Sequence, residues 1–362
     1  MARKMTGVSL AALGLILVAA SFASATSIFN RPGNILISDQ FNNRVIEVDP
    51  RTKNVVWQFG NGSSVAGPHS VVAPNDAERV GNLTLISGTG APAGSEATCP
   101  DGCADNRVFL VNRAGRIVWQ YGQAGVTGAG FNELNTPVQA TFLPSTNTLI
   151  TDQANERVIE VTLRHQIIWQ YGMTGVPGNG FNQLNNPNSA ELLENGDVLI
   201  ADESNNRVIE VNREKEVVWS YNNSGDPTVL NGTAFASRLP NGDTLITDSN
   251  NNRVFEVDMN GSLVGSYYST ASATVPNPIP TRAVRLFNGN TLISNQFAGQ
   301  VIEVNPEGNI VLSFGTLGAN DNAPGDLNAP YDAKQIADYF GLTPPFVDVF
   351  GFERMLSVLE GN

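Results

Sequence analysis

The 362-residue sequence predicts an all-β fold built from six similar units, and three observations support this prediction. A pattern close to Asn-Asn-Arg-Val-Ile-Glu-Val recurs six times, with its first valine at positions 45, 108, 158, 208, 254 and 301. The spacings of 63, 50, 50, 46 and 47 residues are typical of propellers and solenoids. The 35 glycines and 20 prolines, against 15% charged residues, favour many short strands joined by tight turns.

Each unit carries the signals of four antiparallel strands. An apolar strand such as 147–153 precedes the Asn-Arg turn, and the alternating Val-Ile-Glu-Val strand follows it. A later strand, as in 166–172, ends in Trp-Gln-Tyr-Gly, and another lies upstream, as in 188–193. Four strands in each of six repeats predict a six-bladed β-propeller with four-stranded antiparallel blades.

The first unit begins directly at 34–40 and lacks its own upstream strand. Near the other end of the chain, segment 327–336 resembles the lead-in of the fourth unit at 184–193. We therefore expect segment 329–336 to supply the innermost strand of the first blade, which closes the ring and hides an open sheet edge. The alternative is a helix over 332–339.

The N-terminus predicts export from the cytoplasm. Arg3 and Lys4 precede an uncharged run, 5–25, that ends in Ala-Ser-Ala. This pattern is typical of a signal peptide, and the alternative is a retained hydrophobic helix that spans a bilayer or packs in a filament. We divide the chain into a hydrophobic N-terminal segment (1–25), a propeller (26–341) and a C-terminal apolar tail (342–362).

Two further features fit a secreted or cell-surface protein. Cys99 and Cys103 flank a Pro-Asp-Gly turn, so we expect a local disulfide in an oxidising compartment. Five Asn-x-Ser/Thr sequons fall in turns or at strand edges, where a glycan can be attached. The sequon asparagines are Asn61, Asn82, Asn222, Asn231 and Asn260.

Composition excludes several functional classes. The net charge is 21 − 34 = −13 and no basic stretch exists beyond Arg3-Lys4, which argues against a nucleic-acid partner. The two histidines, His69 and His165, are too few and too far from the cysteines for a zinc site. We expect no metal, no other cofactor, and no membrane contact except through a retained N-terminal segment.

The Asp-x-x-Asn-x-Arg-Val core resembles the NHL-repeat family of propellers over about residues 33–336. The matching residues are Asp39 with Arg44, Asp152 with Arg157, Asp202 with Arg207, and Asp248 with Arg253. The second unit departs from the pattern with Gly88 in place of the Asp, and the sixth has Asn295 and Gln300. The Trp-Gln-Tyr-Gly endings are also similar to quinoprotein-like and arylsulfotransferase-like repeats. Because the Asp and Arg recur blade after blade, we expect them to hold the turn rather than to react.

Two other residue types recur with the repeats. We expect the tryptophans to pack between neighbouring blades, namely Trp57, Trp119, Trp169 and Trp219. We expect the repeated glutamates to lie on a partly solvated face of each strand. They are Glu47, Glu160, Glu210, Glu256 and Glu303.

Residues that differ between the repeats define a candidate ligand site at the mouth of the central channel. Aligning the innermost strands on their prolines gives the column Ser70, Gln139, Ser189, Phe235, Arg282 and Asp332. Propeller lyases and lactonases similar to the NHL family hold a metal at that mouth with His, Glu, Asn or Asp. The candidate ligand-binding residues here are His69, Gln139, Glu191, Arg282 and Asp332.

Two functional hypotheses follow. The first is a non-catalytic, secreted or cell-surface module that binds copies of itself, other surface proteins or glycans. Its N-terminal run and apolar tail would allow assembly into a filament. The second is a metal-assisted lyase or hydrolase with its site at the channel mouth. The first is favoured, because the channel column is mixed in polarity and contains no concentration of metal ligands.

Overall fold

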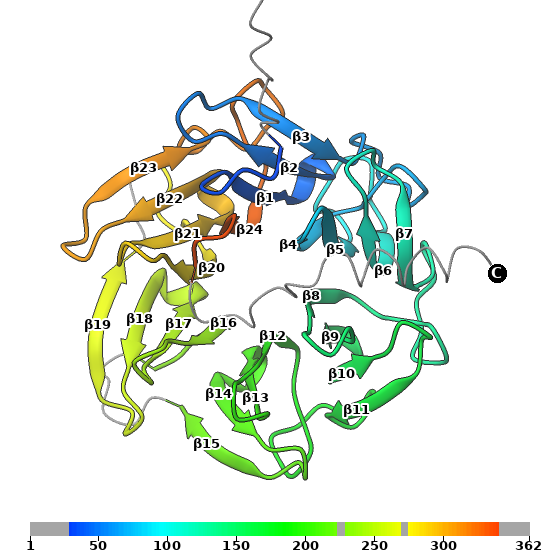
Figure 1. Cartoon of the computed structure of the whole chain (residues 1–362), viewed down its shortest axis with the longest axis vertical. Helices are drawn as coiled ribbons and strands as arrows, with labels where there is room; N and C mark the ends of the chain where they lie inside the picture. Colours follow the sequence, from blue (N-terminus) through cyan, green and yellow to red (C-terminus); the bar gives the residue numbers. More distant parts are fainter. Residues whose placement is uncertain (1–28, 223–228, 269–273, 340–362) are drawn as a thin grey trace, which may run out of the picture.

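The computed structural model describes residues 29–222, 229–268 and 274–339. Six four-stranded antiparallel sheets surround a central axis as the blades of a propeller (Figure 1). The six-bladed fold predicted from the repeats is confirmed. The predicted N-terminal segment 1–25 and C-terminal tail 342–362 lie outside the described residues. No helix within the described ranges is long and apolar enough to cross a membrane.

The four strands of each blade follow one another from the axis outward. Blade one has β24 (Pro330–Gln335), β1 (Ile35–Asp39), β2 (Arg44–Val48) and β3 (Val55–Phe59). Blade two has β4 (Pro74–Val80), β5 (Leu83–Ala91), β6 (Cys103–Val111) and β7 (Ile117–Gly122). Blade three has β8 (Pro137–Phe142), β9 (Thr148–Asp152), β10 (Arg157–Val161) and β11 (Ile167–Tyr171).

The remaining blades repeat this order. Blade four has β12 (Pro187–Leu192), β13 (Val198–Asp202), β14 (Arg207–Val211) and β15 (Val217–Tyr221). Blade five has β16 (Thr233–Arg238), β17 (Thr244–Asp248), β18 (Arg253–Val257) and β19 (Leu263–Tyr268). Blade six has β20 (Pro280–Arg285), β21 (Thr291–Asn295), β22 (Gln300–Val304) and β23 (Ile310–Phe314). Short 3-10 turns join the second and third strands of five blades: η1 (Gln40–Asn42), η2 (Gln153–Asn155), η3 (Glu203–Asn205), η4 (Ser249–Asn251) and η5 (Gln296–Ala298).

The ring is closed by a strand from the far end of the chain. β24 pairs antiparallel with β1, with Ala333 opposite Ile37 and Asp332 opposite Ser38. The predicted closing strand is therefore confirmed, and the alternative helix over 332–339 is wrong. Closure leaves blade one with four strands, like the other blades.

The repeated Asp and Arg lie together at the 3-10 turn of their own blade. Asp202 Oδ2 accepts hydrogen bonds from Arg207 Nε at 2.7 Å and from Asn205 Nδ2 at 2.7 Å. Its Oδ1 accepts the backbone N–H of Asn185 at 2.8 Å, which ties the inter-blade loop to the turn. The corresponding ion pairs measure 2.6 Å for Asp39–Arg44, 2.8 Å for Asp152–Arg157 and 2.7 Å for Asp248–Arg253.

Neighbouring blades are joined by tryptophans and by ion pairs. Each Trp indole donates to a backbone carbonyl in the next blade, as from Trp57 to Arg113 at 3.0 Å and from Trp169 to Arg213 at 3.3 Å. Four of the five repeated glutamates pair with an Arg of the next blade, as in Glu160–Arg213 at 2.8 Å, whereas Glu303 accepts from Asn288 and Asn290 of its own blade. All five are buried rather than partly solvated as predicted, because Arg side chains of the next blade, Asn side chains of their own blade, or both bond their carboxylates.

Candidate functional site

The innermost strand of blade two begins at Pro74, six residues later than the alignment on Pro68 predicts. Asp76 pairs with Ser87 there in the same register in which Gln139 pairs with Thr151 in blade three. Blade two therefore contributes Asp76 to the channel column in place of Ser70. The predicted site residue His69 is exposed in the β3–β4 loop and does not belong to the column.

Four charged side chains from blades six, one and two meet at the inner strands. Arg282 Nη2 lies 3.1 Å from Asp76 Oδ1, and Arg282 Nε lies 3.1 Å from Asp332 Oδ1. Lys334 Nζ lies 2.7 Å from Asp76 Oδ1 and 2.6 Å from Asp332 Oδ2. The most exposed of the four side chains is that of Lys334, at 5%. We call these residues the closure cluster, because β24 supplies two of them and each adjoining blade supplies one.

The closure cluster is internally neutral, with two cations and two carboxylates. Burial opposes the charge of Lys334, but the adjacent carboxylates of Asp332 and Asp76 outweigh this effect and raise the pKa of its ammonium group. Lys334 also donates to the carbonyl oxygen of Ala77 in blade two at 3.0 Å. The predicted residues Arg282 and Asp332 are thus brought together, but in an ion-pair network that joins blades.

The same column satisfies backbone N–H groups on the inner edge of neighbouring blades. Gln139 Oε1 in blade three accepts the N–H of Ala190 in blade four at 2.7 Å. Equivalent bonds run from Ala77 to Asp332 at 3.2 Å, from Ala140 to Asp76 at 3.3 Å, and from Ala236 to Ser189 at 3.2 Å. In each of these four junctions a blade covers the exposed strand edge of the blade that follows it. Phe235 in blade five has no side-chain acceptor atom to offer to blade six.

Two buried carboxyl groups lie two residues farther along these strands. Glu78 accepts the N–H of Phe142 at 3.0 Å, and Glu191 accepts the N–H of Arg238 at 3.0 Å. Burial raises the pKa of Glu78 to about 8. Burial likewise raises the pKa of Glu191 well above its ordinary value, although the Arg238 N–H works in the other direction. Each carboxyl group thus bonds the blade that follows its own.

A tyrosine crosses the channel at the end where the 3-10 turns lie. The hydroxyl of Tyr331 in blade one accepts a hydrogen bond from Asn188 Nδ2 in blade four at 2.8 Å. Blades one and four lie on opposite sides of the ring (Figure 1). Asn188 also donates to Glu203 at 2.8 Å, and burial together with Glu203 raises the pKa of Tyr331. The side chains at this mouth therefore bind one another across the axis.

Metal-ligating residues are not gathered in the part of the chain that the structure describes. No group of three or more His, Cys, Asp or Glu side chains there has the geometry to hold a metal ion. Of the five predicted channel residues, Arg282 and Asp332 touch, while Gln139 and Glu191 bond the next blade.

The alignment on prolines misses Asp76 and Glu78, although a local signal for them exists. The segment Pro74-Asn75-Asp76-Ala77 has the same Pro-x-Asp-Ala pattern as residues 330–333 in the closing strand. Aligning on the second of the two prolines in this region places Asp76 in the column.

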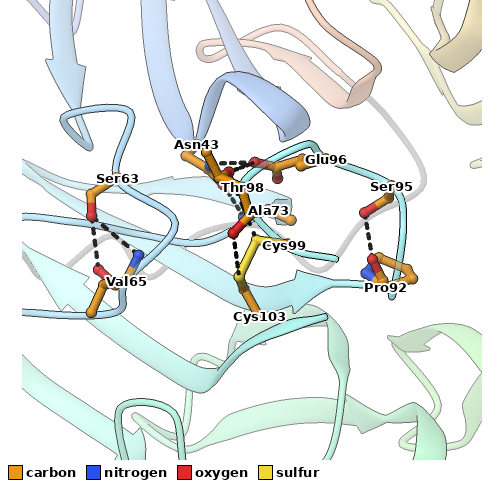
Figure 2. Close-up of a disulfide and its surroundings, with 10 residues drawn as sticks. All are labelled: Asn43, Ser63, Val65, Ala73, Pro92, Ser95, Glu96, Thr98, Cys99 and Cys103. Carbon is orange, nitrogen blue, oxygen red and sulfur yellow. Dashed lines mark hydrogen bonds between the residues drawn. A yellow bond between two sulfur atoms is a disulfide. The ribbon is translucent and has the colours of Figure 1, made fainter. Parts of the chain in front are cut away.

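The disulfide predicted between Cys99 and Cys103 is confirmed, with the two sulfur atoms 2.07 Å apart (Figure 2). It lies in an insertion between β5 and β6, where Cys99 packs with Val72 and Ala73. Asn43 of blade one donates to Glu96 of the insertion at 3.0 Å, so the insertion also contacts the neighbouring blade. The five sequon asparagines are all exposed: Asn61, Asn82, Asn222, Asn231 and Asn260.

Comparison with known proteins places this geometry among propellers. A protein of unknown function from Bacteroides caccae is 17% identical, with a TM-score of 0.56 over 80% of this chain and 97% of its own. A streptogramin B lyase is 13% identical, with a TM-score of 0.53 over 86% of this chain and 87% of its own. A virginiamycin B lyase from Staphylococcus aureus is 11% identical, with a TM-score of 0.50 over 79% and 85%. These likenesses show the fold alone, and no curated protein matches the sequence.

A family model matches the larger part of the propeller. Residues 26–260 match the model described as outer membrane protein assembly factor BamB. The match runs from before β1 to the turn that follows β18 in blade five. The match does not confirm the NHL-repeat name, but it supports the broader expectation that the chain belongs to a related family of repeat propellers. The chain therefore belongs to the family of outer membrane protein assembly factor BamB.

Proposed function

We propose that this chain is a non-catalytic, extracytoplasmic β-propeller that serves as a structural or interaction module. The closure cluster is the observation that carries the proposal. Both of its carboxylates contact both of its cations within 3.1 Å, and all four side chains are buried. Removing one partner of such a buried pair costs about 3–5 kcal/mol, so these groups are poor ligands for a substrate or a metal.

Two observations support the extracytoplasmic part of the proposal. The Cys99–Cys103 disulfide is stable in an oxidising compartment, and disulfides are rare where thiols are kept reduced. The family match is to an outer membrane protein assembly factor. We further propose that the exposed sequons carry glycans and that the repeats are of the narrower NHL type.

The inter-blade loops offer a surface for partners. Phe131 and Phe181 occupy corresponding places in the β7–β8 and β11–β12 loops and are 75% and 74% exposed. The loops are held in shape from within, because the side chains of Asn132 and Asn182 each accept a backbone N–H at 3.0 Å. Exposed apolar side chains on a rigid support are typical of binding surfaces. They are consistent with a surface-protein partner and, equally, with copies of this chain in a filament.

The alternative is a metal-assisted lyase or hydrolase that uses the buried carboxyl groups Glu78 and Glu191. Isothermal titration of the purified full chain with Zn²⁺, Mn²⁺, Mg²⁺ and Ca²⁺ tests it, together with turnover of a streptogramin B antibiotic. For a non-catalytic module we expect no stoichiometric metal and no turnover. One metal per chain that is lost in a Glu191→Gln variant, with turnover lost in parallel, would establish the enzyme instead. Asp101→Asn, an exposed change in the disulfide loop, is the matched control.

A further inference from the structure

One face of the propeller is made of tight turns, and we call it the turn face. Because the strands of each blade are antiparallel, the turns after the first and third strands lie at the end opposite the 3-10 turns. Trp57 in β3 of blade one donates to Arg113 O in the β6–β7 turn of blade two, and Trp169 in β11 of blade three donates to Arg213 O in the β14–β15 turn of blade four. Lys53 Nζ donates to Ser313 O at 3.0 Å, which connects blade one to blade six. The turns therefore follow one another around the whole face.

The turn face is basic over blades one, two and three. Its segments there are 29–34, 49–54, 81–82, 112–116, 143–147 and 162–166, together with 336–339, which follows β24. All their Lys and Arg side chains are exposed: Arg31, Arg51, Lys53, Arg113, Arg116 and Arg164. These segments contain two acidic residues. Asp49 is paired with Arg51 at 3.1 Å, and Asp338 accepts the backbone N–H of Phe287 at 2.8 Å. This basic half contrasts with the net charge of −13 on the whole chain.

The turn face is acidic over blades four, five and six. Its segments there are 193–197, 212–216, 239–243, 258–262, 286–290 and 305–309. They contain seven carboxylates: Glu194, Asp197, Glu214, Glu216, Asp243, Asp258 and Glu307. Their two cations are Lys215 and Arg213, and the latter already pairs with Glu160 of blade three.

We propose that the turn face binds a second copy of this chain, face to face about a two-fold axis. An axis along the diameter that separates the two halves lays each basic half on the partner's acidic half. Blade one then faces blade six of the partner, blade two faces blade five, and blade three faces blade four (Figure 1). Such an isologous contact uses one surface twice and closes at two chains. The inference rests on the proposed interaction function and names its partner.

A second copy fits this face better than an anionic surface does. An anionic lipid layer complements the basic half only, and it would lie against the seven carboxylates on the same face. Like charges brought together across an interface cost several kcal/mol, whereas complementary halves attract in both directions. The pattern also sets the register, because a rotation of one propeller by three blades would place like charges opposite each other.

Charge reversal tests the proposal on the full chain. One variant carries Lys53→Glu and Arg164→Glu in the basic half, and the other carries Glu214→Lys and Glu307→Lys in the acidic half. All four side chains are exposed in turns of this face. We expect wild-type dimers in sedimentation velocity at low salt that dissociate as salt screens the charges. Each variant alone should dimerise at least about tenfold more weakly, because both of its symmetric contacts become repulsive. An equimolar mixture of the two should restore the dimer.

The control is Asp101→Lys with Asp321→Lys, which changes the net charge as the acidic-half variant does but in exposed loops of the opposite face. It should dimerise like wild type. A monomeric wild type, or a dimer that both reversed variants keep, overturns the inference. Binding of the monomer to phosphatidylglycerol vesicles, lost in the basic-half variant, also overturns it in favour of a lipid surface. Each of these results would overturn the dimer without contradicting the proposed non-catalytic function. Metal-dependent turnover would refute that function, whether the protein is a monomer or a dimer.

Discussion

Asp105 fills the space that Gly88 leaves in blade two. A Cβ atom added at Gly88 would lie 2.6 Å from the Asp105 carboxyl carbon. In this blade the repeat carboxylate comes from the third strand instead of the second. Asp105 pairs with Arg107 and accepts the N–H of Val72 at 2.8 Å, contacts that the repeat Asp makes elsewhere.

This relationship predicts the behaviour of a repeat-restoring pair of substitutions. Gly88→Asp alone should lower the free energy of unfolding by about 1–3 kcal/mol, because the new side chain overpacks the site and sets two carboxylates together. Asp105→Asn added to it recreates the arrangement of Asp152 and Asn155 in blade three and should recover most of the loss. Urea unfolding of the four members of this cycle measures the coupling. Additive losses would contradict the exchange of roles.

A second prediction concerns the closure cluster. Lys334→Met leaves the two buried carboxylates of Asp76 and Asp332 with one cation, Arg282, instead of two. We expect a loss of about 3–5 kcal/mol in the free energy of unfolding, as for other broken buried pairs. Arg51→Met removes a cation from an ion pair whose arginine is 62% exposed, and it should leave the free energy of unfolding nearly unchanged because solvent screens such pairs. Equal effects in urea unfolding would show that the cluster does not hold the ring closed.

A third prediction concerns pH. Burial raises the pKa of Glu78 from 4.5 in the unfolded chain to about 8, so the folded protein holds a proton that the unfolded chain has released. The free energy of unfolding should therefore fall as pH rises from about 4.5 to about 8, by up to about 1.4 kcal/mol per pH unit from this group. Glu78→Gln keeps an acceptor for the Phe142 N–H and should flatten this slope. The exposed Glu194→Gln is the control, and parallel curves for wild type and Glu78→Gln would refute the prediction.

A fourth prediction separates the repeat Asp from chemistry. Asp202→Ala removes the acceptor of three hydrogen bonds and the carboxylate partner of Arg207, so we expect a loss of about 1–3 kcal/mol in the free energy of unfolding. The neutral pair Asp202→Asn with Arg207→Gln copies Asn295 and Gln300 of blade six and should cost much less. Thermal unfolding ranks the two variants. Any binding activity per folded molecule should be unchanged in both, and its loss at full stability would assign Asp202 a functional role.

The fold could be predicted because its evidence is local and repeated. The strand signals recur in every unit, and the closing strand carries the lead-in motif of another blade. Alignment on prolines misplaces the channel column in blade two because two prolines, Pro68 and Pro74, lie close together there. The pairing of Asp76 with Ser87 identifies Pro74 as the start of the strand, in agreement with the Pro-x-Asp-Ala pattern. The charge halves of the turn face could not be predicted, since their members are separated along the chain and gather only once the ring is closed.

The hydrogen bonds along the inner strand edges have an evolutionary consequence. Gln139 of blade three accepts the N–H of Ala190 in the following blade, and the N–H of Ala140 in blade three is itself bonded by Asp76 of the preceding blade. A duplicated blade would therefore bring both halves of the contact with it and fit between any two such neighbours. Phe235 interrupts this series between blades five and six, so a gain or loss of blades at that junction would break no edge bond of this kind. The edge bonds therefore do not themselves fix the number of blades, which depends instead on the curvature that the ring can adopt.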